Sequence, residues 1–108
     1  MRLRGHIYRA RLPGERKRRP ALVVSANVRN ELANTVVIVP ATTLLRVGPW
    51  HVRLKKGEGG LQHASVLRCE NIVAIPKQLL DERPLGDSLS RRRMDEVRSA
   101  LLVALDFD

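Results

Sequence analysis

The sequence is poor in aromatic and sulfur-containing side chains. Its aromatic residues are Tyr8, Trp50 and Phe107, and Cys69 is its one cysteine. Nucleic-acid modules such as the RRM and the OB-fold stack bases on several exposed rings, so three scattered rings argue against both. A lone cysteine cannot form an internal disulfide. Because Cys69 lies in the apolar run SVLRCENIVAI, we expect a buried thiol without a catalytic role.

Long apolar runs and metal-binding motifs are missing as well. No stretch approaches the roughly 18 apolar residues of a membrane-spanning helix, and the N-terminus lacks the apolar core of a signal peptide. We therefore expect a cytoplasmic protein without a membrane partner. The histidines His6, His51 and His63 lack ligands at metal-binding spacing, and the GEGG turn lacks the Lys-Ser/Thr of a phosphate-binding loop. No metal or cofactor is expected.

Acidic residues are outnumbered by basic ones. The chain has 20 Lys and Arg against 11 Asp and Glu, which gives a net charge of +9. Residues 1–19 carry eight cations and one anion, whereas residues 77–108 carry six cations and seven anions. This concentration in the first half predicts one face that binds a polyanion, with nucleic acid favoured over membrane.

The remaining composition is that of a globular protein. With 108 residues, 44% of them hydrophobic, the chain is expected to form a single domain over residues 1–108. The apolar runs ALVVS and TVVIVP predict two buried, neighbouring strands, and Pro20 suits the first position of the former. Alternating patterns predict half-exposed strands in HIYRARL and WHVRL, and LQHASVLRCENIVAI reads as one long strand.

Helical signals are fewer. NVRNELAN predicts a single helical turn, and PKQLLDERPLGDSL a helical turn and a brief strand. Ser90 is expected to cap a helix from Arg91 to about Leu105 whose buried face comprises Met94, Val97, Leu101, Ala104 and Leu105. The three arginines that begin this helix face the unfavourable end of its dipole, and solvation is expected to make them tolerable. Together these elements predict a mainly β fold, either a strongly bent antiparallel sheet or a small barrel of five to seven strands.

Candidate chemistry lies at two strand ends. Arg19 precedes the strand ALVVS and Thr43 follows TVVIVP, so the two would meet if these strands are antiparallel neighbours. Metal-free RNA cleavage needs activation of the 2′-OH, stabilisation of phosphorane charge and protonation of the leaving oxygen. Arginine and threonine side chains can supply the donors for that charge. The alternative is that residues 16–19 form only a solvated basic loop. Trp50 suits either stacking on a base or packing in the core.

The succession of motifs resembles a known family. G-x-I-Y, R-P-A-L-V-V-S, V-V-I-V-P-A-T-T, H-V-R-L and S-V-L-R-C-E-N-I, followed by an amphipathic helix, are similar to the MazF/PemK toxin endoribonucleases of type II toxin-antitoxin systems, over Gly5 to Leu105. The resemblance implies an SH3-like barrel shared with CcdB, a homodimer and a cognate MazE-like antitoxin. It also implies an mRNA interferase, which cuts single-stranded RNA at short sequences through the 2′-OH without metal.

The resemblance also assigns roles by position. Arg19, directly before the proline, corresponds to the catalytic arginine, and Thr43 to the catalytic threonine, with Thr42 as the adjacent alternative. Substrate-binding positions correspond to Glu15, Arg16, Lys17, Arg18, Thr42, His51, Ser65, Glu70 and Asn71. Two features depart from the family: the loop GERKRR is short, with Glu15 as the remnant of its acidic residue, and Val73 stands where many relatives carry a cation.

Two other functions stay open at this point. One is a CcdB-like toxin that poisons gyrase through its C-terminal helix, which the near-neutral charge of residues 77–108 disfavours. The other is a barrel that binds nucleic acid without cleaving it.

Overall fold

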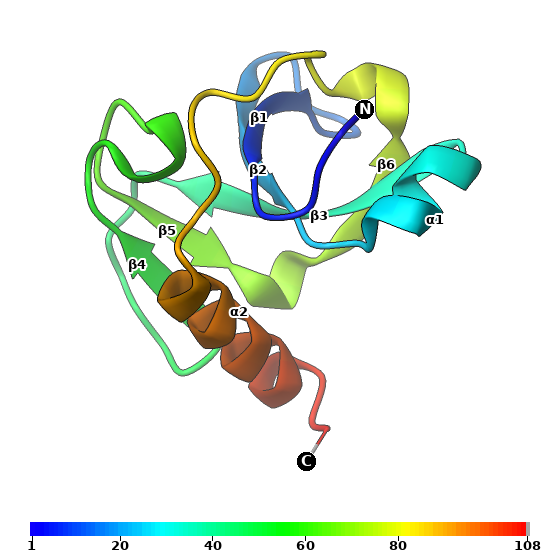
Figure 1. The fold of residues 1–108 in the computed structure, drawn as a ribbon. Helices are drawn as coiled ribbons and strands as arrows, with labels where there is room; N and C mark the ends of the chain where they lie inside the picture. The colour runs from blue at the N-terminus through cyan, green and yellow to red at the C-terminus, as the bar shows by residue number, and fades with distance from the viewer. Residues whose placement is uncertain (108) are drawn as a thin grey trace.

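Six antiparallel strands and a C-terminal helix build the fold of residues 1–107, the part of the chain that this computed structural model describes (Figure 1). The strands are β1 (Ile7–Arg11), β2 (Arg18–Val23), β3 (Thr35–Thr42), β4 (His51–Leu54), β5 (Ser65–Arg68) and β6 (Val73–Pro76). The helices are α1 (Asn27–Leu32) and α2 (Arg91–Ala104), with short 3₁₀ turns η1 (Glu58–Gly60), η2 (Cys69–Asn71) and η3 (Lys77–Leu79). The expected mainly β fold, with five to seven strands and a terminal helix, is confirmed.

Strand β3 is the centre of the sheet. The strand order is β1-β2-β3-β5-β4, and β6 also pairs with β3. One edge of β3 pairs with β2, while the other pairs with β6 along Thr35 to Ile38 and with β5 at Ala41 and Thr42. The sheet therefore bends sharply around β3 but stays open, since among residues 1–107 the strands β1 and β4 do not pair.

Both faces are buried over residues 21–23 of β2 and residues 38–41 of β3, as the runs ALVVS and TVVIVP predicted. On one face, Leu22 and Val39 belong to a core that α2 covers with Val97 and Ala100. On the other face, Ala21, Val23 and Ile38 belong to a second core with Tyr8 of β1. Full burial of one such aliphatic side chain contributes about 1.5–3 kcal/mol. Two cores that share two strands hold the β2–β3 pairing in a fixed register.

The segment predicted as one long strand is interrupted, so that prediction is wrong. Thr42 pairs with Val66, and the same register would place Ile38 opposite residue 70, yet Ile38 pairs with Val73. The three additional residues form η2, where the chain turns so that Cys69 reaches the core beneath α2. The Cys69 thiol is fully buried, as expected, and burial raises its pKa to about 12.

Two other predictions of strand ends need correction. Pro20 is the third residue of β2 and not the first. It faces Arg9, whose carbonyl accepts a hydrogen bond from Asp81 N on the outer edge of β1, so this pair needs no donor from Pro20. In residues 76–89 the helical turn forms as η3, but the brief strand is only a bridge between Leu80 and Ala10.

Helix α2 begins as predicted, because the Ser90 hydroxyl accepts a hydrogen bond from Arg93 N at 3.2 Å. Its buried face was predicted with two errors, since Ala100 is buried whereas Leu105 is half-exposed. Solvation is not what accommodates Arg93, whose guanidinium lies 2.9 Å from Glu58 and 2.8 Å from Glu96. The hydrogen bond from Arg93 lowers the pKa of Glu58. Within residues 1–107 no helix is long and apolar enough to cross a membrane.

A test of this packing compares two glycines with similar backbones. Gly60 (φ +86°) and Gly14 (φ +80°) both lie in the left-handed region, but a Cβ on Gly60 would overlap the Leu85 carbonyl, whereas nothing lies within 4 Å of a Cβ on Gly14. We expect Gly14→Ala to lower the free energy of unfolding by about 1–2 kcal/mol through backbone strain, and Gly60→Ala by about 1–3 kcal/mol more through overpacking. Urea denaturation measures both, and equal losses would contradict the close approach at Gly60.

Candidate active site

The β2–β3 pairing decides which polar side chains share a face. Ala21 lies opposite Pro40, so the same register, continued by two residues, places Arg19 opposite Thr42. One residue further it places Arg18 opposite Thr43. Directly opposed residues of an antiparallel pair project to the same side of the sheet. Arg19 therefore shares a face with Thr42, whereas Arg18 shares the other face with Thr43.

The face of Arg19 and Thr42 continues across β5 and β4. Thr42 lies opposite Val66, and Arg68, two residues later on β5, lies opposite His51. We call this row of side chains, Arg19, Thr42, Arg68 and His51, the outer row. A hollow of about 450 Å³ on this side is lined by Thr42, Leu44, Leu45, Arg46, His51 and Arg68. The row thus brings cations and a hydroxyl from four strands to one open surface.

Glu15 orients one end of the outer row. Its carboxylate lies 2.9 Å from the Arg19 guanidinium, and the two side chains are 36% and 41% exposed. A pair this exposed contributes at most about 1 kcal/mol to stability. Its consequence is geometric, because it holds the planar guanidinium at the end of β2 while leaving donors free for a phosphate.

His51 and Glu70 fix the other end. His51 Nδ1 accepts a hydrogen bond from Gly48 N at 2.9 Å, and Nε2, on the other side of the ring, donates to Glu70 Oε2 at 2.8 Å. Arg68 lies 3.4 Å from the same carboxylate oxygen. Burial raises the pKa of Glu70, but hydrogen bonds from His51 and Arg68 outweigh it and hold that pKa below its usual range. With both ring nitrogens engaged, His51 anchors the loop before β4.

The opposite face opens into a second hollow, which we call the inner cleft. It measures about 320 Å³, and its lining includes the cations Arg9 and Arg18, the residues Thr42, Thr43 and Ser65, and the polar residues Gln62 and His63. The Ser65 hydroxyl donates to the His63 carbonyl at 3.0 Å and so ties the loop after η1 to β5. Thr42, at the end of β3, borders both hollows.

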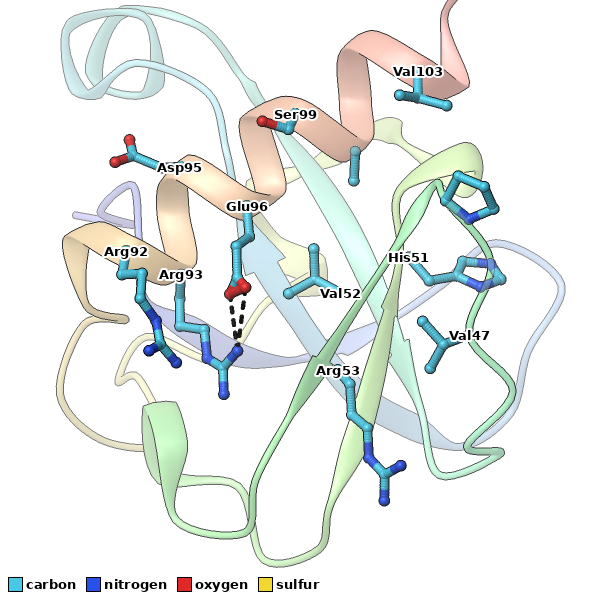
Figure 2. Close-up of a pocket in the computed structure, with 12 residues that line it drawn as sticks. Val47, His51, Val52, Arg53, Arg92, Arg93, Asp95, Glu96, Ser99 and Val103 are labelled. Carbon is cyan, nitrogen blue, oxygen red and sulfur yellow. Dashed lines mark hydrogen bonds and ion pairs between the residues drawn. The ribbon is translucent and has the colours of Figure 1, made fainter.

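A third hollow, of about 550 Å³, separates α2 from β4 and has mixed charge (Figure 2). Arg53 and Arg92 line it together with Asp95 and Glu96, and Glu96 pairs with Arg93 across its wall. A site for a polyanion needs a positive surface, which the outer row and the inner cleft provide better. Among residues 1–107 no three His, Cys, Asp or Glu side chains gather into a group that could hold a metal ion.

Comparison with known proteins places this geometry in a family. The model of the PemK-like, MazF-like toxins of type II toxin-antitoxin systems matches residues 3–105. The chain belongs to this family. Endoribonuclease EndoA of Bacillus subtilis is 29% identical over 89 residues, which cover 81% of this chain and 75% of the relative.

Solved structures of MazF-like toxins share the fold. A mycobacterial endoribonuclease, determined in complex with its cognate antitoxin, superposes with a TM-score of 0.84 at 31% identity and covers 98% of this chain and 96% of its own. The Mycobacterium tuberculosis toxin MazF-mt6 superposes with a TM-score of 0.84 at 29% identity over 95% of this chain and 98% of its own. The family resemblance read from the motifs is therefore confirmed.

The structure of this MazF-like chain divides the predicted site residues between its two faces. Arg19, Glu15, Thr42, His51 and Glu70 gather at the outer row, whereas Arg18, Thr43 and Ser65 border the inner cleft. Arg16 and Lys17 are exposed on the β1–β2 loop, Asn71 is exposed in η2, and Val73 is partly exposed on β6. Trp50 is 40% exposed and packs edge-on against His51, so it is not a core residue.

Several polar residues of the site were missed from the sequence, namely Arg9, Gln62, His63 and Arg68. The alternation in HIYRARL gave a signal for Arg9, because it predicts an outward side chain at that position. Arg68 could not be found this way, since its neighbours His51 and Glu70 meet it only through the β4–β5 pairing and the η2 turn.

The lowered pKa of Glu70 predicts a pH effect on stability. A carboxyl whose pKa is lower in the folded state adds stability above its unfolded pKa of about 4.3, and this contribution is lost as pH falls through the folded pKa. Glu70→Gln should therefore cost up to about 1 kcal/mol at pH 7, and its difference from the parent should shrink as pH falls below about 4.3 and through the lower folded pKa. Urea denaturation across this range measures it. The matched change Glu82→Gln, at an exposed residue, should show no such trend; a deficit for Glu70→Gln that persists at low pH would contradict the ion-pair account.

Proposed function

We propose that this chain is the toxin of a type II toxin-antitoxin pair, a cytoplasmic endoribonuclease that cuts single-stranded RNA at specific short sequences without a metal ion. The observation that carries the proposal is the β2–β3 register, which, continued by two residues beyond Ala21 and Pro40, puts Arg19 on the same face as Thr42, and Arg19 also pairs with the Glu15 carboxylate. The family and the endoribonucleases among its matched relatives support the reaction class. The net charge of +9 suits an RNA substrate.

The proposed reaction is attack by the 2′-oxygen of RNA on the adjacent phosphorus. The 2′-O–P bond forms, the P–O5′ bond breaks, the 2′-OH loses its proton and the departing O5′ gains one, leaving a 2′,3′-cyclic phosphate. Arg19 and Thr42 would donate hydrogen bonds to the phosphorane oxygens, where negative charge develops. An arginine side chain stays protonated in proteins, so we assign Arg19 an electrostatic role and not a proton transfer.

Thr42 is the better candidate than Thr43 for this role. The β2–β3 register supports this choice, because its continuation beyond Ala21 and Pro40 would put Thr42 opposite Arg19 and Thr43 on the other face with Arg18. The Thr42 hydroxyl accepts a hydrogen bond from Leu44 N at 3.2 Å. That bond leaves the hydroxyl proton free to point at a phosphate oxygen.

Around this chemistry we assign Glu15 as the residue that orients Arg19, and His51 and Glu70 as the residues that hold the far end of the outer row. Arg16, Lys17, Arg18, Ser65 and Asn71 would contact RNA around the cut. We further propose that residues 1–108 form one domain, because the two cores share β2 and β3, and that it works as a homodimer.

A MazE-like antitoxin is the proposed inhibitor. The mycobacterial structure that matches this chain is a complex with its cognate antitoxin. An acidic, extended segment could occupy the cationic surface that otherwise receives RNA, because carboxylates and phosphates compete for the same guanidinium donors.

The direct test uses a long RNA in the presence of EDTA, with cut sites mapped by primer extension. Short oligonucleotides that span a mapped site are then compared with versions in which the nucleotide 5′ of the cut is deoxy. We expect cleavage in EDTA and none of the deoxy version, because the nucleophile is absent. Full cleavage of the deoxy oligonucleotide would overturn the 2′-OH mechanism. Binding of RNA without any cleavage product would instead support a nucleic-acid-binding protein. Intact RNA together with inhibition of supercoiling by gyrase would support a gyrase poison.

A further inference from the structure

The β1–β2 hairpin carries arginines in direct opposition. Arg9 and Arg11 are exposed on β1, and the pairing places Arg9 opposite Pro20 and Arg11 opposite Arg18. The Arg9 carbonyl accepts from Asp81 N outside the hairpin, so Arg9 and Pro20 form a non-hydrogen-bonded pair. Alternation makes the Arg11–Arg18 pair non-hydrogen-bonded as well. In such pairs the Cα atoms are about 4.5 Å apart and the side chains lie close together.

This arrangement costs stability in the isolated protein. Like charges placed directly opposite each other across two strands are destabilising. Asp81, 2.6 Å from Arg18, offsets part of the repulsion, but both side chains are more than 40% exposed and the pair is screened by solvent. Residues 9–19 hold six cations and one anion, a net charge of +5. A surface that concentrates uncompensated cations in this way suits a polyanion.

The arginines continue the inner cleft. Arg9 and Arg18 line that cleft together with Thr43 and Ser65, and Arg11, paired with Arg18, lies one step further toward the hairpin loop. We call Arg9, Arg11 and Arg18 the arginine strip. It leads from the cleft toward the exposed cations Arg16 and Lys17 of the loop.

The surroundings of the strip favour nucleic acid over protein as the polyanion. Protein interfaces usually contain an apolar centre, whereas nucleic-acid interfaces are more polar and more positive. Within residues 1–107, no large apolar side chain between Leu3 and Val28, the interval that contains the β1–β2 hairpin, is exposed. The β1–β2 hairpin itself therefore presents cations without exposed large apolar side chains of the kind that would anchor an acidic peptide.

We propose that the arginine strip binds the phosphates of the RNA that flanks the cleaved site, independently of base sequence. It would thereby direct the RNA strand along the β1–β2 hairpin. The proposal rests on RNA being the substrate. Phosphate contacts of this kind fix position and add salt-dependent affinity without reading bases.

The test measures binding of a 2′-O-methyl RNA oligonucleotide, which lacks the attacking hydroxyl, by fluorescence anisotropy between 50 and 400 mM KCl. Each phosphate contact to a single strand adds about 0.7 to the slope of log affinity against log salt, so losing two contacts should make the slope shallower by about 1.4. We expect this for the double variant Arg9→Ala with Arg11→Ala. The double variant Arg9→Lys with Arg11→Lys keeps both charges and should retain the slope. Asp81→Asn should raise affinity at low salt, because it removes the counter-charge of Arg18.

The matched control removes two other exposed arginines, Arg91→Ala with Arg98→Ala on α2, and should change the slope less. Equal changes of slope in the two double variants would overturn the proposal. It would also be overturned if the strip variant lost affinity for polyglutamate, an acidic peptide, while its RNA binding stayed intact. Thermal melting of each variant checks that it is folded. Mapped cut sites should be the same for the parent and the strip variant. If the parent binds RNA with the expected slope but yields no cleavage product, the proposed function fails while the strip assignment stands.

Discussion

The antiparallel pairing of β2 with β3 is the constraint on which the site depends. In each strand, alternate side chains pack in the core under α2, and the side chains between them pack in the core against β1. A slip of the register by one residue would exchange the two sets of side chains. The same register, extended to the strand ends, places Arg19 with Thr42 and Arg18 with Thr43. Hydrophobic packing thus determines which hydroxyl accompanies which guanidinium.

Cations in this protein have two kinds of environment. Arg93 is nearly buried between Glu58 and Glu96 and joins η1 to α2, and Arg68 shares Glu70 with His51. These arginines support the walls of the site. Along the β1–β2 hairpin, by contrast, Arg9, Arg11, Arg16 and Lys17 are exposed. The uneven distribution of charge along the sequence therefore corresponds to a division between arginines held in ion pairs and cations exposed on the hairpin.

Local patterns predicted much of the fold, and the reasons for the errors are non-local. Runs of β-branched residues identified β2 and β3, and Ser90 identified the start of α2, because each signal lies within one element. The interruption at η2 was missed, because it arises from a three-residue offset between two pairings with β3. Which of Thr42 and Thr43 shares a face with Arg19 was equally inaccessible, since the faces of two adjacent residues can be assigned only once the strand register is known. The pairing of Arg93 with Glu58, 35 residues away, could not be read from the sequence, although its second partner, Glu96, is three residues away on the same helix.

The central claim is that Arg19 and Thr42 act as one unit on the scissile phosphate. A double-mutant cycle in single-turnover cleavage tests it, with Arg19→Ala, Thr42→Ala, Thr43→Ala and the two double variants. We expect Arg19→Ala and Thr42→Ala each to slow cleavage by about 10²–10³-fold, and their combination to be scarcely slower than either, since groups that act together are not additive. Thr43→Ala should have a small effect that adds to that of Arg19→Ala. Additive losses for Arg19 and Thr42, with coupling between Arg19 and Thr43 instead, would contradict the account.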